Sequence, residues 1–93
     1  MTKLNDLEKT WQKSPKFKAE YDALAEEFAL ADTLIGARTE ADMTQKQVAE
    51  KMQTSQSYIA KMEGGIISPS MKALRRYAEA TGSRLKISLE HEV

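Results

Sequence analysis

Small hydrogen-bonding side chains gather at one point of the stretch TQKQVAEKMQTSQSYIAKMEGG, residues 44–65. Glutamine can bridge the N6 and N7 atoms of adenine, serine can donate to or accept from several bases, and lysine reaches guanine or phosphate. At the start of a short helix, such side chains have the length and chemistry to read base edges in the major groove of DNA. The residues that we assign to base contacts are Ser55, Gln56, Ser57 and Lys61.

A second group of polar side chains suits the phosphate backbone of DNA. The N-terminus of a helix favours anions, and Gln45 stands at the start of the helix that precedes the base-reading residues. The residues that we assign to phosphate contacts are Thr44, Gln45, Lys46, Tyr58 and Lys72. Alternatives stay open, because serine and glutamine also serve as ordinary capping residues, Tyr58 could pack on the core, and Lys72 could be solvated.

Two short helices have to position these residues. Thr44 is expected to cap the first, with Gln47 completing a capping box. The second is expected over residues 55–62, with Gly64 and Gly65 ending it. Two such helices joined by a turn of three or four residues form a helix-turn-helix, and Ala49 is the small residue that their crossing needs.

Further helices are expected on both sides of this pair. After it, the sequence Ser-Pro-Ser at 68–70 starts a helix that stops at Gly82. Its expected buried side carries Met71, Leu74, Tyr77 and Ala78. Before the pair, Ser14 and Pro15 start a long helix that reaches about Glu40. Its apolar residues follow a seven-residue repeat: Phe17, Tyr21, Leu24, Phe28, Ala31 and Ile35. This repeat is longer than a small domain needs from one helix, and an earlier short helix adds Leu4, Leu7 and Trp11.

The sequence RLKISLE near the C-terminus alternates apolar and polar residues, which predicts a β-strand. Leu85, Ile87 and Leu89 share its apolar face. A lone strand has an unsatisfied edge, so we weigh two arrangements for it. It could pair with its own copy across a two-fold axis, or it could dock as an extended tail on its own helices. We favour the dimer.

Composition limits the classes of function. A chain of 93 residues forms one compact domain with an appendage, and without cysteine it has neither disulfides nor a zinc-thiolate site. No segment resembles a membrane span or a secretory leader, so a cytoplasmic location is expected. No arrangement of carboxylates, nucleophile and base or metal ligands stands out, and His91 lies at the end of the chain. We therefore expect no enzyme, no metal site and no cofactor.

The charge balance differs along the chain. The formal net charge is zero, yet residues 20–42 hold seven acids against one base, and residues 44–76 hold six bases against two acids. Such asymmetry is typical of two surfaces with different partners, although scattered solvation charges would also produce it.

Together these features resemble the XRE-type helix-turn-helix of phage repressors and Cro proteins. The resemblance covers about residues 28–81 and includes Gln45, Ala49, Ser55, Gln56, Ile59, Glu63, Gly64, Gly65 and Pro69. It implies that Gln45 binds phosphate and that the base-reading residues are those named above. It also implies that Arg38 pairs with Glu63. One departure is Gln53, which stands in the turn where the family often has glycine, and a positive φ there would cost about 1 kcal/mol relative to glycine.

The whole chain is similar to HigA-type antitoxins of bacterial toxin–antitoxin modules. That resemblance implies a homodimer that binds double-stranded operator DNA, represses its own operon and neutralises an mRNA-cleaving toxin of the RelE/HigB type. The toxin-binding residues would be Leu4, Leu7, Trp11, Phe17, Tyr21 and Leu24. The alternative is a stand-alone XRE-family repressor without a toxin partner.

The expected architecture is accordingly all-α, a five-helix helix-turn-helix fold with an extended N-terminal helical region and a C-terminal strand that pairs in a dimer. Residues 1–27 would form the partner-binding region, residues 28–82 the DNA-binding domain, and residues 83–93 the dimerisation segment.

Overall fold

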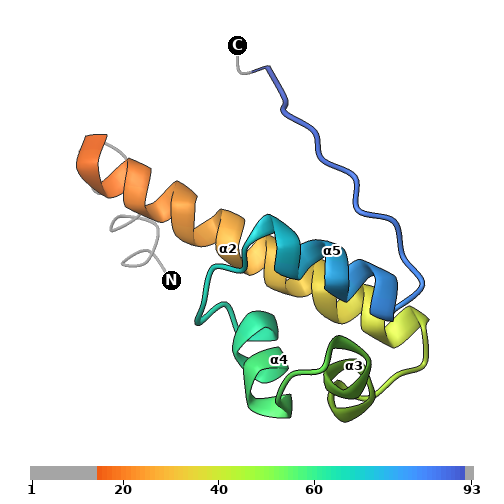
Figure 1. Ribbon diagram of the computed structural model, residues 1–93. Helices are drawn as coiled ribbons and strands as arrows, with labels where there is room; N and C mark the ends of the chain where they lie inside the picture. Colours follow the sequence, from red (N-terminus) through yellow and green to blue (C-terminus); the bar gives the residue numbers. More distant parts are fainter. Residues whose placement is uncertain (1–14, 92–93) are drawn as a thin grey trace.

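The computed structural model describes residues 15–91, and four helices form within this range (Figure 1). Helix α2 spans Pro15–Glu40, α3 spans Gln45–Met52, α4 spans Gln56–Glu63 and α5 spans Met71–Ala80. The expected all-α class is confirmed, but the expected five helices are not, because residues 15–91 form four. The predicted short helix with Leu4, Leu7 and Trp11 lies outside the described residues.

Short polar side chains start the three shorter helices. Thr44 and Gln47 form the expected capping box at α3, where Thr44 Oγ1 accepts from the Gln47 amide at 3.1 Å and Gln47 Oε1 accepts from the Thr44 amide at 2.8 Å. Ser55 caps α4 by accepting from the Tyr58 amide, and Ser70 caps α5 by accepting from the Ala73 amide. Each cap satisfies an N–H group that the helix itself leaves unpaired.

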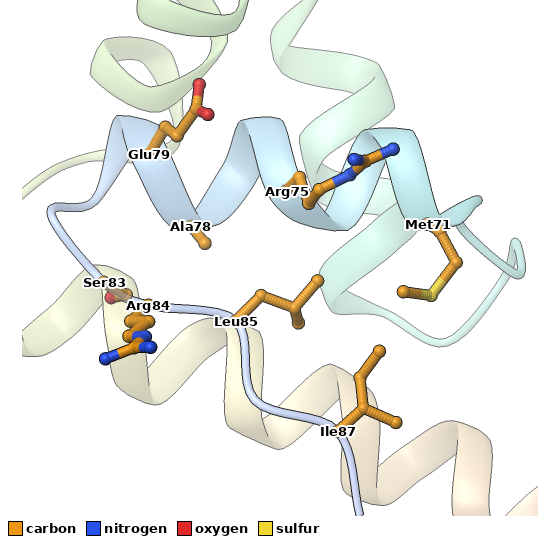
Figure 2. Close-up of a pocket in the computed structure, with 8 residues that line it drawn as sticks. All are labelled: Met71, Arg75, Ala78, Glu79, Ser83, Arg84, Leu85 and Ile87. Carbon is orange, nitrogen blue, oxygen red and sulfur yellow. The ribbon is translucent and has the colours of Figure 1, made fainter.

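The core lies where α3, α4 and α5 meet the C-terminal part of α2. The largest fully buried side chains are those of Tyr77, Ile59, Met62 and Val48. Ala49 is buried in the same cluster, as the crossing of α3 and α4 requires. Met71 was expected in this core but is 48% exposed. It lines an open depression of about 620 Å³ beside α5, which no other element of the described part of the chain fills (Figure 2).

Helix α2 consists of two parts with different surroundings. Its inner half, residues 30–40, carries Ala31 and Leu34 into the core. Its outer half, residues 15–29, projects beyond the other three helices, and every residue from 18 to 29 is exposed (Figure 1). The 26 residues of α2 correspond to a rod about 39 Å long. The long helix is therefore confirmed, and more than a third of it lies outside the core.

The predicted C-terminal strand is wrong for this chain, because residues 83–91 form no strand. A strand needs a second strand to pair with, and the described residues offer none. The segment instead leaves α5 as extended chain and runs away from the helices (Figure 1). Leu85 is half-buried and lies with Leu30 and Leu74 around a cavity of about 270 Å³, whereas Ile87 and Leu89 are exposed. The first part of the segment thus follows the alternative expectation of a tail docked on its own helices.

Candidate nucleic-acid interface

Helices α3 and α4 and the turn between them have the geometry of a helix-turn-helix. The turn comprises residues 53–55, and Gln53 ends α3 in the left-handed conformation with φ 56° and ψ 46°. The Thr54 amide donates to the Ala49 carbonyl at 2.9 Å, which closes the end of α3. The turn therefore keeps the left-handed geometry that glycine would favour, although glutamine occupies it.

The four residues assigned to base contacts lie together at the exposed surface of α4. Ser55, Gln56, Ser57 and Lys61 are all exposed. Gln56 and Ala60 stand four residues apart, as do Ser57 and Lys61, so these positions form one face of the helix. The Ser55 oxygen is engaged in the α4 cap, which leaves its hydroxyl hydrogen available to a base. The buried residues Ile59 and Met62 hold the opposite face in the core.

The five residues assigned to phosphate contacts differ in their surroundings. Lys46 and Lys72 are exposed near the N-termini of α3 and α5. Thr44 is exposed and caps α3. Tyr58 is half-buried and packs against the core, which matches the packing alternative left open for it. Gln45 is half-buried as well, and its side-chain amide donates to Glu63 Oε1 at 3.1 Å.

A buried polar cluster joins all four helices behind this surface. Arg38 of α2 binds the Glu63 carboxylate through Nε at 2.8 Å and through Nη2 at 2.9 Å, and its Nη1 donates to the Met43 carbonyl. The Tyr77 hydroxyl of α5 lies 2.7 Å from Glu63 Oε2 and 2.7 Å from the Leu34 carbonyl oxygen. Together with Gln45, these groups surround the end of α4. The expected pair of Arg38 and Glu63 is confirmed.

The electrostatics of the cluster favour an ionised Glu63. Burial raises the pKa of its carboxyl group, but hydrogen bonds from Arg38, Tyr77 and Gln45 outweigh burial and hold the pKa below its ordinary value. The pKa of Arg38 is raised, chiefly by its hydrogen bond to Glu63. Burial and then the Glu63 carboxylate raise the pKa of Tyr77, so its phenol stays protonated. The cluster therefore holds α4 through an ion pair supported by two neutral donors.

Two interactions of this scaffold escaped the sequence reasoning. Tyr77 was expected only as a core residue, although a buried tyrosine hydroxyl needs a hydrogen-bond partner, which was the available signal. Arg76 donates from Nη2 to the Met52 carbonyl at 2.7 Å and so closes the C-terminal end of α3. Nothing in the residue pattern distinguished Arg76 from its neighbour Arg75.

Other kinds of site find little support in residues 15–91. Within that range no group of three or more histidine, cysteine, aspartate or glutamate side chains is arranged to hold a metal ion. None of the helices in the same part of the chain has the length and apolarity to span a membrane.

Comparison with known proteins agrees with the geometry. Residues 35–87 match the helix-turn-helix family. The curated relatives include antitoxin HigA1 from two strains of Mycobacterium tuberculosis, CDC 1551 and H37Rv, each 33% identical over 76 residues. The aligned region is 82% of this chain but 51% of each relative, so the chain spans about half the length of the curated relatives it matches. No solved structure matches. The family match covers more than half of the chain, over the residues that form α3, α4 and α5, and the chain belongs to the XRE-type helix-turn-helix family.

Proposed function

We propose that this protein is a HigA-like antitoxin that binds operator DNA as a dimer, represses its own operon and neutralises an mRNA-cleaving toxin of the RelE/HigB type. The observation that carries the DNA-binding part is the exposed polar face of α4 on a helix-turn-helix. Similarity to proteins named antitoxin HigA1 supports the part of the proposal that concerns toxin neutralisation.

In this proposal α4 enters the major groove. Gln56 and Ser57 lie in its first turn, where recognition helices bring side chains to base edges, and Lys61 follows one turn later. Ser55 contributes its hydroxyl from the cap position. Because the opposite face of α4 is buried, the helix cannot rotate away from the groove without loss of core contacts.

Phosphates on either side of the groove would meet the starts of α3 and α5. Lys46 and Lys72 supply charge there, and Thr44 and Tyr58 supply hydroxyl groups. Gln45 uses one amide hydrogen on Glu63, and its second amide hydrogen can reach a phosphate. The Glu63 cluster would then fix the phosphate-binding end of α3 relative to α4.

The remaining parts of the chain would serve protein partners. Residues 1–27 would bind the toxin, through Leu4, Leu7, Trp11, Phe17, Tyr21 and Leu24. Residues 83–93 would contribute to the dimer, through Leu85, Ile87 and Leu89. The exposure of Ile87 and Leu89, 64% and 98%, is compatible with such a contact.

The test combines DNA binding with toxin neutralisation. The full-length protein is titrated onto DNA from upstream of its gene, and footprinting is expected to reveal a palindrome with half-sites about one helical turn apart. The protein is then co-expressed with the HigB-type toxin of its own operon, and recovery of growth is measured. Specific DNA binding without growth recovery would favour the stand-alone repressor, and binding no tighter than to random DNA would contradict the proposal.

A further inference from the structure

The outer half of α2 carries an apolar strip that no described element covers. Tyr21, Leu24 and Phe28 are 45%, 49% and 52% exposed. Their spacing of three and four residues puts them on one face of the helix, in the repeat that continues at Ala31 within the core. We call Tyr21, Leu24 and Phe28 the α2 strip.

One end of the α2 strip is held against the domain. A Cβ built on Gly65 would lie 3.4 Å from Phe28 Cδ1, so the ring lies close to the backbone of the loop after α4. Ile66, the next residue of that loop, is 73% exposed and adds apolar surface beside it. The strip is therefore attached to a folded surface, as a preformed docking site needs to be.

The charges beside the α2 strip are acidic. Residues 20–32 contain no lysine or arginine, and they include these five acids: Glu20, Asp22, Glu26, Glu27 and Asp32. All five are exposed. In the seven-residue repeat that places Tyr21 and Phe28 at position a, Glu20 and Glu27 occupy position g at the edge of the strip.

These charges disfavour a second copy of the same helix. In an antiparallel pair of α2 helices, g positions face g positions, so Glu20 and Glu27 would face their own copies. In a parallel pair, Glu27 would face Asp32 at position e of the copy. Each arrangement brings like charges together at the rim of an apolar seam, which opposes association.

The outer half of α2 projects beyond the other three helices, and α3 lies near the other end of α2 (Figure 1). The strip meets the folded domain at Phe28, beside the loop that follows α4.

We infer that the α2 strip is the docking surface for a cationic amphipathic element of a protein partner, with apolar side chains on Tyr21, Leu24 and Phe28 and lysine or arginine beside Glu20 and Glu27. This inference deepens the proposed function and rests on it, because it gives the chemistry of the partner surface and adds Phe28 to the contact.

The probe is a four-heptad helical peptide with leucine at a and d and lysine at e and g, compared with the same peptide carrying glutamate at e and g. Binding to the full-length protein is measured by fluorescence anisotropy. The lysine peptide is expected to bind at least about tenfold more tightly than the glutamate peptide. Leu24→Asp is expected to abolish the difference, and the double variant Glu20→Lys/Glu27→Lys to reverse the preference.

The matched control is Asp22→Lys/Glu26→Lys, which makes the same change of charge on the opposite face of α2. It is expected to keep the preference for the lysine peptide. Equal responses of the two double variants would overturn the inference, since net charge alone would then explain binding.

Two further outcomes would assign the strip to other occupants and overturn the inference. If Leu24→Asp converts a dimer to a monomer in sedimentation, a second copy covers the strip. If Leu24→Asp lowers the melting temperature of the free protein, the chain covers it itself. DNA binding of all variants is measured in parallel. If the unmodified protein does not bind its operator, the proposed function fails, and this outcome is distinct from a protein that binds its operator but shows no preference for the lysine peptide.

Discussion

Arg38 of α2 and Glu63 of α4, 25 positions apart in the sequence, form a bidentate ion pair with Nε–Oε2 at 2.8 Å and Nη2–Oε1 at 2.9 Å. The Glu63 side chain is 3% exposed and that of Arg38 is 19% exposed. Breaking one partner of such a pair strands the other charge away from water. The pair thus ties the end of α4, the helix proposed to read bases, to the long helix α2.

Replacing Glu63 by glutamine is expected to destabilise the fold by about 3 kcal/mol, because Arg38 loses its counter-charge inside the protein. The free energy of unfolding is measured by urea denaturation. Glu50→Gln, at an exposed position of α3, is the control and is expected to change the stability by less than about 0.5 kcal/mol. Similar effects of the two variants would mean that Arg38 and Glu63 contribute no more than surface charges.

Because the Glu63 carboxylate is ionised in the folded protein, we expect the fold to lose stability in acid. The pKa of Glu63 is lower in the folded chain than its ordinary value of 4.5, so the stability that its ionised carboxylate contributes is complete above that ordinary value. That stabilisation is lost as the pH falls from the ordinary pKa through the lower pKa of the folded chain. The urea midpoint is followed from neutral pH to pH of about 3, and Glu63→Gln is expected to show a shallower decline than the unmodified protein. Parallel curves would assign the acid sensitivity to other groups.

Gln53→Gly is expected to stabilise the fold by about 1 kcal/mol, because a side chain is strained at φ 56° and glycine is not. Thermal unfolding followed by circular dichroism measures the change. Asp42 has a similar φ of 55°, but aspartate tolerates this region better, so Asp42→Gly is expected to give a smaller gain. A loss of stability in Gln53→Gly would show that the Gln53 side chain makes compensating contacts.

Gln56→Ala is expected to weaken binding to the operator by about 1–3 kcal/mol and to relax the preference at one base pair. Affinities are measured on the operator and on random duplex of equal length, at one salt concentration. An equal loss on both DNAs would remove Gln56 from base reading. An unchanged circular dichroism spectrum excludes a folding defect.

Lys46→Ala is expected to weaken binding evenly on all sequences and to reduce the slope of log affinity against log salt by about one. Lys86→Ala is the matched control, since Lys86 is equally exposed but lies on the C-terminal segment. Its slope is expected to stay unchanged. If both variants alter the slope alike, the lysine effect reflects overall charge and not a phosphate contact.

The parts of the fold with local signals could be predicted from the sequence. Thr44 with Gln47 marks a capping box within four residues, and Ser55 is of the residue type that caps helices, the alternative left open for it. The left-handed conformation of Gln53 had no local signal of its own and was expected only from the resemblance to the helix-turn-helix family, which often has glycine there. The caps depend on neighbouring residues, which is why the sequence contains enough information for them.

The parts that depend on distant neighbours could not be predicted in the same way. The alternation around Leu85 and Ile87 is typical of a strand, but no second strand is present among residues 15–91 to pair with it. Met71 has the spacing of a core residue, yet no element within residues 15–91 covers its end of α5, and its side chain is exposed. The contact of Gln45 with Glu63 joins side chains 18 positions apart and becomes visible only once α3 and α4 are packed.

Helix α2 runs unbroken from Pro15 to Glu40, which gives its two halves a common axis. Tyr21 therefore lies about 15 Å along that axis from Ala31, at a fixed rotation about it. A protein held at Tyr21 would keep a constant orientation relative to the DNA groove that α4 is proposed to enter. In a dimer bound to half-sites about one helical turn apart, the two bound partners would then lie on the same side of the duplex.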